Sequence, residues 1–325
     1  MAFSNTYNKT NPGSAVSNRE DLTDILTILA PEETPILSMA NKSKATATYN
    51  EWTVDVLATP SSTGIREGVD ISSYTDKFSG RARLGNYVQL FRRDYMVSQL
   101  QQAVESVGPA RIAEAEAKSI REIKRDMEKA LVGDQDRAVE DGSTTAYALR
   151  GLGNWLSSSG PTDVPSNFRT PAASISGSGT TLTESVFNGL VASIFTQTGT
   201  VDALTCVAGT TVRRTISGFA RSDGNPAENV YHVNQFATDK EITFSVNTYD
   251  SDFGLITVIN GNPVCLPDSS RGYLINPNYV GVAELMSLGS TRVPNQGGGE
   301  RGYVDAALTL QVMSPLAHGK ITAVV

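Results

Sequence analysis

The hydrophobic pattern is clearest in residues 109–132, where apolar side chains recur at helical spacing within a charged background. Pro109 suits the first turn of a helix, and Gly133 suits the left-handed position after the last turn. Such a helix is roughly 36 Å long at 1.5 Å per residue. Its narrow apolar stripe consists of Ile112, Ala113, Ile120, Ile123, Met127, Ala130 and Leu131. We expect a long helix that is buried on one side and exposed to solvent or neighbouring subunits on the other.

The amino-terminal segment combines a polar stretch with a short amphipathic one. Residues 1–16 are rich in Ser, Asn and Thr and predict a mobile arm. Ser17 and Glu20 form a capping box for a helix that ends at Pro31, and Thr34-Pro35 begins a second short turn. The apolar face of the first helix consists of Leu22, Ile25, Leu26 and Leu29. These few residues cannot form a core alone, so we expect them to dock elsewhere, possibly on another subunit.

A long polar loop separates the next two predicted strands, Glu51–Leu57 and Tyr87–Met96. Residues 58–86 are rich in Gly, Ser and Thr and poor in large apolar residues. Connections of this length are usually functional, or they are hairpin arms that project from the body. A short helix, Val97–Val107, follows the second strand.

The second half of the chain predicts a mixed globular region. After the loop-rich residues 134–179, Thr183 caps a helix that ends at Gly199. A buried strand at Leu204–Ala208 and a helix at Thr210–Phe219 come next. Turn residues separate the remaining predicted strands, Val230–Phe236, Ile242–Tyr249, Leu255–Ile259, Tyr273–Ile275, Val280–Leu285 and Tyr303–Met313. The fold class is therefore α+β.

Composition describes an ordinary folded chain of 325 residues with a net charge of −7, long enough for two domains or one elongated domain. The only dense basic group is Arg121, Lys124, Arg125 and Lys129, and acidic residues interrupt it. We interpret this group as an ion-pair face, with pairs Lys118–Glu122 and Lys124–Glu128, in preference to a phosphate-binding ridge.

Catalytic signals are few. Cys206 and Cys265 lie in apolar stretches and predict buried thiols, and nothing supports a disulfide. His232 and His318 have no partner at metal-ligand spacing, and the glycine-rich segments lack the context of a phosphate loop. We expect no catalytic, metal or cofactor-binding residues, no cofactor and no membrane span. An enzyme with a cleft near residues 161–171 is the weakest alternative.

Five segments, in order along nearly the whole chain, resemble the major capsid proteins of tailed bacteriophages with the Hong-Kong-97-type fold (the DUF-type phage capsid family). One is a helix that ends in Ala-Pro-Glu-Glu-Thr-Pro, and another is Glu-Ile-Lys-Arg-Asp-Met-Glu-Lys-Ala-Leu in the long helix. The segments are 22–38, 51–55 with 67–68 and 85–89, 122–131, 249–254 and 307–321. Residues 134–200 match no such pattern.

The resemblance implies a domain organisation. Residues 1–45 would be the N-arm, and 46–97 the E-loop with its flanking strands (the loop itself about 58–86). Residues 98–140 would be the P-domain with its spine helix at 109–132. Most of 141–275 would be the A-domain, and 276–325 would be C-terminal strands that return to the P-domain.

The resemblance also implies a function. The chain would be a non-enzymatic major capsid protein that self-assembles into hexamers and pentamers of an icosahedral head enclosing double-stranded DNA, without sequence-specific binding. It would assemble in the bacterial host cytoplasm and reside in the virion. Only about 20 residues precede the first predicted helix, so we expect a separate scaffolding protein, with portal and possibly decoration proteins as further partners. The alternative is another structural virion protein, such as a tail tube, fibre or decoration protein.

The candidate subunit contacts come from three segments: the N-arm, the E-loop and the spine. For the charged loop residues, solvated surface charge is the competing interpretation. An E-loop lysine crosslink is not expected for Lys77, because no matching motif is present. The candidates are Leu22, Ile25, Leu26, Leu29, Arg66, Glu67, Asp76, Lys77, Arg81, Arg83, Arg121, Arg125 and Lys129.

Overall fold

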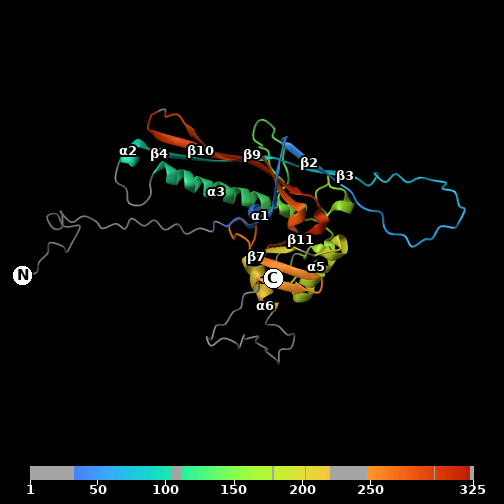
Figure 1. Ribbon diagram of the computed structural model, residues 1–325. Coiled ribbons are helices and arrows are strands. Elements are labelled where there is room, and N and C mark those ends of the chain that lie inside the picture. Colours follow the sequence, from blue (N-terminus) through green and yellow to red (C-terminus); the bar gives the residue numbers. More distant parts are fainter. Residues whose placement is uncertain are drawn as a thin grey trace, which may run out of the picture.

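The structure, a computed structural model, describes residues 33–103, 111–177, 179–201, 203–219, 247–295 and 297–322. A long sheet with one helix lying along it forms the upper part of the molecule, and a second sheet with two helices forms the lower part (Figure 1). A loop between β2 and β3 projects far beyond both parts (Figure 1). The mixture of helices and sheets confirms the predicted α+β class.

The upper sheet has the strand order β1-β9-β10-β4. Its centre is a hairpin of two 14-residue strands, β9 (Val280–Val293) and β10 (Gly299–Val312). Strand β4 (Gln89–Ser98) pairs antiparallel with β10, and β1 (Asn41–Lys44) pairs parallel with β9. Both hairpin strands extend beyond their predicted limits at the hairpin turn, where pairing between them continues. The outer half of β9 is mostly polar and exposed, and no apolar pattern marks it as a strand.

The long helix α3 (Ile112–Val132) lies against one face of this sheet (Figure 1). Its buried stripe contains Ile123, Met127 and Leu131, which confirms a one-sided helix. The helix begins at Ile112, with Arg111 as its N-cap, rather than at Pro109, which lies outside the described residues. Gly133 is also extended (φ −63°, ψ 166°) instead of left-handed, because the chain continues directly into the next segment without reversing.

The lower sheet has the order β11-β8-β5-β7-β6 and separates two cores. On strand β8 (Gly272–Ile275), Tyr273 and Ile275 belong to the core that contains α3, whereas Leu274 belongs to the core beneath α5 and α6. This alternation follows from the two-residue period of a strand. The sheet is therefore a wall shared by both cores. Its other strands are β5 (Thr205–Ala208), β6 (Thr248–Ser251), β7 (Gly254–Asn260) and β11 (Gly319–Ile321).

The helices of the lower part agree closely with the sequence. Helix α5 (Glu184–Thr198) is capped by the Thr183 side chain, which accepts a hydrogen bond from the Val186 backbone N–H, and Gly199 is left-handed (φ 72°). Helix α6 (Thr210–Phe219) has the predicted bounds. The predicted strand 230–236 lies outside the described residues, as does most of 242–249. Both cysteines are buried and free, as expected.

Short elements complete the fold. They are α1 (Pro35–Met39), α2 (Gln99–Ala103), α4 (Leu152–Trp155), and the 3-10 turns Ser166–Phe168, Ala172–Ser174, Pro277–Tyr279 and Pro315–Ala317. Among the described residues, no helix has the length and apolar character needed to cross a membrane.

Candidate subunit interface

The projecting loop is carried by a two-stranded ribbon, β2 (Tyr49–Val54) and β3 (Ala82–Tyr87), which pair antiparallel. We call residues 55–81, which connect the strands, the arm. The predicted loop 58–86 was too long at its carboxyl end, because residues 82–86 belong to β3. Their sequence, Ala-Arg-Leu-Gly-Asn, does not have strand character by itself, and pairing with β2 makes them extended.

The arm exposes large apolar side chains along its whole length. Leu57 is 98% exposed and Tyr74 is 89% exposed. Monomeric proteins rarely leave so many large apolar groups in water, and continuous exposure of this kind marks an interaction surface. The exposed apolar residues of the arm are Val56, Leu57, Ile65, Val69, Ile71, Tyr74 and Phe78.

Some of the predicted charged residues of this segment contact other residues of the ribbon and arm, and others have no ion-pair partner. Arg81 Nε lies 2.8 Å from Asp55 Oδ2 where the arm begins, and this hydrogen bond lowers the pKa of Asp55. Arg83 forms a longer cross-strand pair with Glu51 (3.6 Å). Asp76 Oδ1 accepts a hydrogen bond from the Phe78 backbone N–H and shapes a turn. Within the part of the chain that the structure describes, Arg66, Glu67 and Lys77 have no ion-pair partner.

The inner face of the ribbon packs on the body. Leu84 is buried, and the Trp52 ring lies 5.7 Å from the Trp155 ring. Next to them, the buried Asn86 side chain accepts a hydrogen bond from the Arg150 N–H (2.8 Å) and donates to the carbonyls of Arg150 and Leu310. Asn86 therefore fixes β3 to two separate segments of the body.

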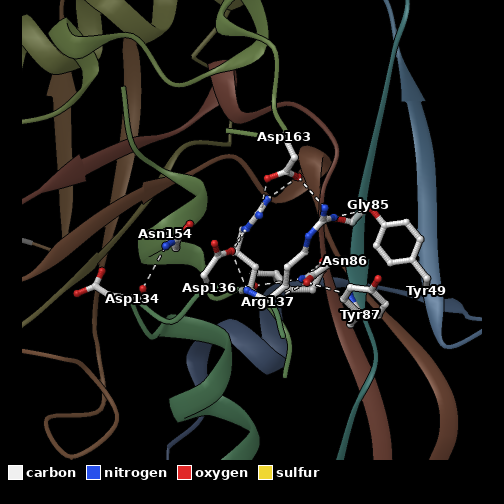
Figure 2. Close-up of polar contacts among 11 residues, drawn as sticks. Tyr49, Gly85, Asn86, Tyr87, Asp134, Asp136, Arg137, Asn154 and Asp163 are labelled. Carbon is white, nitrogen blue, oxygen red and sulfur yellow. Dashed lines mark hydrogen bonds and ion pairs between the residues drawn. The ribbon is translucent and has the colours of Figure 1, made fainter. Parts of the chain in front are cut away.

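A second segment, residues 134–148, contacts the outer face of the same ribbon, where Arg137 lies beside Tyr49, Gly85 and Tyr87 (Figure 2). Arg137 from this segment donates hydrogen bonds to the Gly85 carbonyl (2.9 Å) and to the Tyr49 hydroxyl. Its guanidinium also lies near the rings of Tyr49 and Tyr87 (5.2 and 5.8 Å to the centroids). We call residues 134–148 the strap, because they hold the ribbon against the body.

Arg150 links the strap to the body. Its side chain is 1% exposed, and it pairs with Asp136 (2.6 Å) and bidentately with Asp163 (2.7 and 3.2 Å). Asp163 also pairs with Arg137 (3.2 Å). Burial alone would raise the pKa of Asp163, but the hydrogen bond from Arg150 and the two positive charges hold it below its ordinary value.

Sequence reasoning missed this network. Arg150 occupies an apolar stretch, Ala-Leu-Arg-Gly-Leu, and an isolated charge there was the only available signal of a buried ion pair. The partners Asp136 and Asp163 lie 14 and 13 positions away in irregular segments, and no helix or strand spacing brings them together.

The predicted spine residues Arg125 and Lys129 line a groove on the solvent side of α3. This groove of about 310 Å³ also includes Arg93 and Val264, and it adjoins a larger one of about 770 Å³ that shares Lys129 and Val264. Arg93 forms a bidentate pair with Asp126 (2.6 and 2.8 Å) on the same wall. Arg121 is exposed on the helix beside the groove.

One ion pair of the predicted face is present and one is not. Lys118 and Glu122 pair at 3.9 Å, as expected. Lys124–Glu128 was wrong, because Glu128 is buried and accepts hydrogen bonds from the backbone N–H groups of Ile36 and Leu37. The predicted N-arm contacts Leu22, Ile25, Leu26 and Leu29 lie outside the described residues.

Three features bear on the candidates for chemistry named by the sequence: metal-ligating side chains, the pocket near Pro161 and the thiols. The described residues contain no group of three or more His, Cys, Asp or Glu side chains suited to a metal. A polar pocket of about 460 Å³ does lie near Pro161, but its charged groups have partners within the chain: Arg271 pairs with Asp134, and the Lys320 ammonium donates to the Gly153 carbonyl. Burial raises the pKa of the Cys265 thiol to about 11, which leaves it a poor nucleophile.

Sequence and structure comparisons decide between the remaining possibilities. The model of the SU10 major capsid protein family matches residues 3–325. The chain belongs to this family. The match confirms the expectation of a major capsid protein of a phage head, and it favours the capsid over a tail tube, fibre or decoration protein. No curated protein sequence matches the chain significantly.

Solved capsids share the fold at low sequence identity. The capsid of cyanophage A-1(L) matches with a TM-score of 0.66 and 15% identity, covering 95% of this chain and 98% of that one. The capsid of the native GTA particle matches with 0.61 and 12%, covering 96% and 97%. The capsid of cyanophage P-SCSP1u matches with 0.61 and 12%, covering 99% and 98%. The Hong-Kong-97-type fold is confirmed.

Proposed function

We propose that the chain forms the hexamers and pentamers of an icosahedral phage head that encloses double-stranded DNA, and that the arm carries the principal subunit contact. The observation that supports this proposal most strongly is the continuous apolar exposure of residues 56–78. Burying one Leu, Ile or Phe side chain contributes about 1.5–3 kcal/mol, whereas an exposed ion pair contributes about 0–1 kcal/mol. Apolar burial by the arm therefore dominates, and the charged residues adjust the orientation.

We assign the parts of the chain accordingly. Residues 1–45 form the N-arm, 46–97 the E-loop with its flanking strands, 98–140 the P-domain with α3 as spine, and most of 141–275 the A-domain. The carboxyl-terminal residues 276–325 provide β9 and β10 to the upper sheet and β11 to the lower one. Arg66, Glu67 and Lys77, which have no ion-pair partner within the described residues, are proposed to meet charges of a neighbouring copy, as are Arg121, Arg125 and Lys129.

The proposed role is structural, not enzymatic, and it needs no cofactor. A separate scaffolding protein, a portal and a decoration protein are the proposed partners, with assembly in the bacterial host cytoplasm. The net charge of −7 favours enclosure of DNA without sequence-specific contacts.

Electron microscopy of the chain, expressed alone and with a scaffolding protein, tests the proposal. Closed shells or rings of five and six subunits are expected. Stacked rings that form an open tube would overturn it.

A further inference from the structure

We propose that Arg137 is a positioning residue that sets the direction in which the arm leaves the body. This inference rests on the proposed function for its importance in assembly, but the geometry behind it belongs to the single chain. The ribbon is contacted by the rest of the chain on both faces, and Arg137 provides the charged contact from the strap on the outer one.

The two faces of the ribbon have different kinds of contact. The inner face is fixed by apolar packing of Leu84 and Trp52 and by the three hydrogen bonds of buried Asn86 with the body. The outer face is contacted by side chains from the strap, namely Arg137 and Tyr147, whose ring lies 5.7 Å from that of Tyr87. In this proposal the inner contacts hold the ribbon on the body, and the outer contacts set the angle at which the ribbon leaves the body.

The local sequence is suited to this contact. A Cβ atom at Gly85 would lie 2.6 Å from the Tyr49 ring, so only glycine lets Tyr49 cross the ribbon and lie beside Arg137. Because Arg137 also donates to the Gly85 carbonyl, its guanidinium contacts both strands of the ribbon, β2 at Tyr49 and β3 at Gly85. A lysine, with its single ammonium, cannot reproduce this planar, forked contact.

Within the network, Arg150 is expected to stabilise the fold, whereas Arg137 is expected to set the direction of the arm. The Arg150 side chain is buried and pairs with both Asp136 and Asp163, so its removal would break contacts inside the body and would destabilise the fold. Arg137 is the outer member, and its loss leaves Asp163 paired with Arg150. Substitution of Arg137 is therefore expected to free the ribbon without unfolding the chain.

The test measures arm direction in the soluble, full-length chain. Spin labels on Leu57→Cys, at the start of the arm, and Lys124→Cys, on exposed α3, report one distance by double electron–electron resonance; the native thiols are both buried. We expect a single narrow peak for the otherwise unchanged chain. Arg137→Ala is expected to lose that peak to a broad distribution, and Arg137→Lys to give an intermediate width.

Two further variants complete the test. Gly85→Ala displaces Tyr49 and is expected to broaden the distribution without removing any charge. Arg83→Ala is the matched control, because Arg83 lies on the same face of the ribbon but pairs only across it, with Glu51. Unchanged distributions in folded Arg137→Ala and Gly85→Ala, or equal broadening in Arg83→Ala, would overturn the proposal. Failure of the unsubstituted chain to form shells would instead count against the proposed function, since this distance is measured before assembly.

Discussion

The carboxylate of Glu128 accepts a hydrogen bond from the backbone N–H of Ile36, 3.0 Å away, although 92 positions separate the two residues. It accepts a second one from Leu37 (2.9 Å). Helix α1 starts with Pro35, which has no N–H, and the Thr34 side chain makes no capping bond. Glu128 on α3 therefore caps α1 from a distance and joins the amino-terminal segment to the long helix.

Replacing this cap is expected to loosen α1. Glu128→Ala leaves two backbone donors without an acceptor and should lower the free energy of unfolding by about 2 kcal/mol. Burial raises the pKa of Glu128 despite the two hydrogen bonds, so the ionised group carries a desolvation penalty. Glu128→Gln removes that penalty and keeps one acceptor, and it should cost less. Hydrogen exchange at Ile36 and Leu37 measures the effect; unchanged protection in Glu128→Ala would contradict it.

The wrong prediction for Glu128 shows which contacts cannot be predicted from neighbouring positions in the sequence. The spacing of Lys124 and Glu128 is that of a surface ion pair, and nothing within a few positions indicates that α1 covers this part of the helix. Thr183 and Gly199 were predicted correctly because both act within one helical turn of their own position. Caps that are local in sequence can be predicted, whereas a cap supplied by another helix cannot.

The apolar residues of the arm are expected to matter for assembly and not for folding. Replacing Ile65, Ile71 and Tyr74 together by serine removes side chains that are exposed in the single chain, so the melting temperature should hardly change. Shell yield, measured by light scattering and electron microscopy, should fall sharply. Serine at Arg66 and Lys77 is the matched control and should reduce the yield less. A triple variant that assembles normally would exclude these contacts.

His318 predicts a stability that depends on pH. The ring is fully buried, with Nδ1 accepting a hydrogen bond from the Asn276 N–H, and burial lowers its pKa to about 4. The folded pKa is thus below the unfolded value of about 6.5, so this contribution is complete above pH 6.5 and is lost as pH falls toward 4. The loss over this range is about 3 kcal/mol, at 1.36 kcal/mol per pKa unit.

Urea titrations of the unsubstituted chain and of His318→Gln measure this dependence. The difference between their unfolding free energies should change with pH between 6.5 and 4 and stay constant above that range. A difference that is constant throughout would show that the pKa of His318 is the same in the folded and the unfolded chain. Carboxylate titrations affect both proteins and cancel in the comparison.

The two thiols are expected to be unreactive in the folded chain. Burial raises the pKa of Cys206 to about 12, and it raises that of Cys265 as well. Alkylation at pH 8 requires the thiolate and access to solvent, and neither is available at these sites. Mass spectrometry should find both cysteines unmodified until denaturant is added. Rapid labelling of Cys265 alone would show that the segment containing Val264 opens in the native protein.

Other parts of the molecule were predictable to different degrees. The carboxyl end of α3 and its one-sided burial follow from periodicity, which needs no partner, whereas its start at Ile112 does not. The anchoring of the ribbon does not, because Arg137, Arg150 and Asp163 carry no pattern and become a network only when the segments before and after α4 meet. The strand character of residues 82–86 was hidden for a similar reason, since Gly85 serves the packing of Tyr49 and not the strand.

The lower sheet, with Leu274 on one side and Tyr273 on the other, has a mechanical consequence. A single strand contributes to both cores, so sliding one half of the molecule past the other would tear side chains out of close-packed surroundings on two sides at once. The body should therefore tilt as a single block when copies meet at different angles. The segments that extend from that block, such as the arm, must then accommodate the different angles between neighbouring copies.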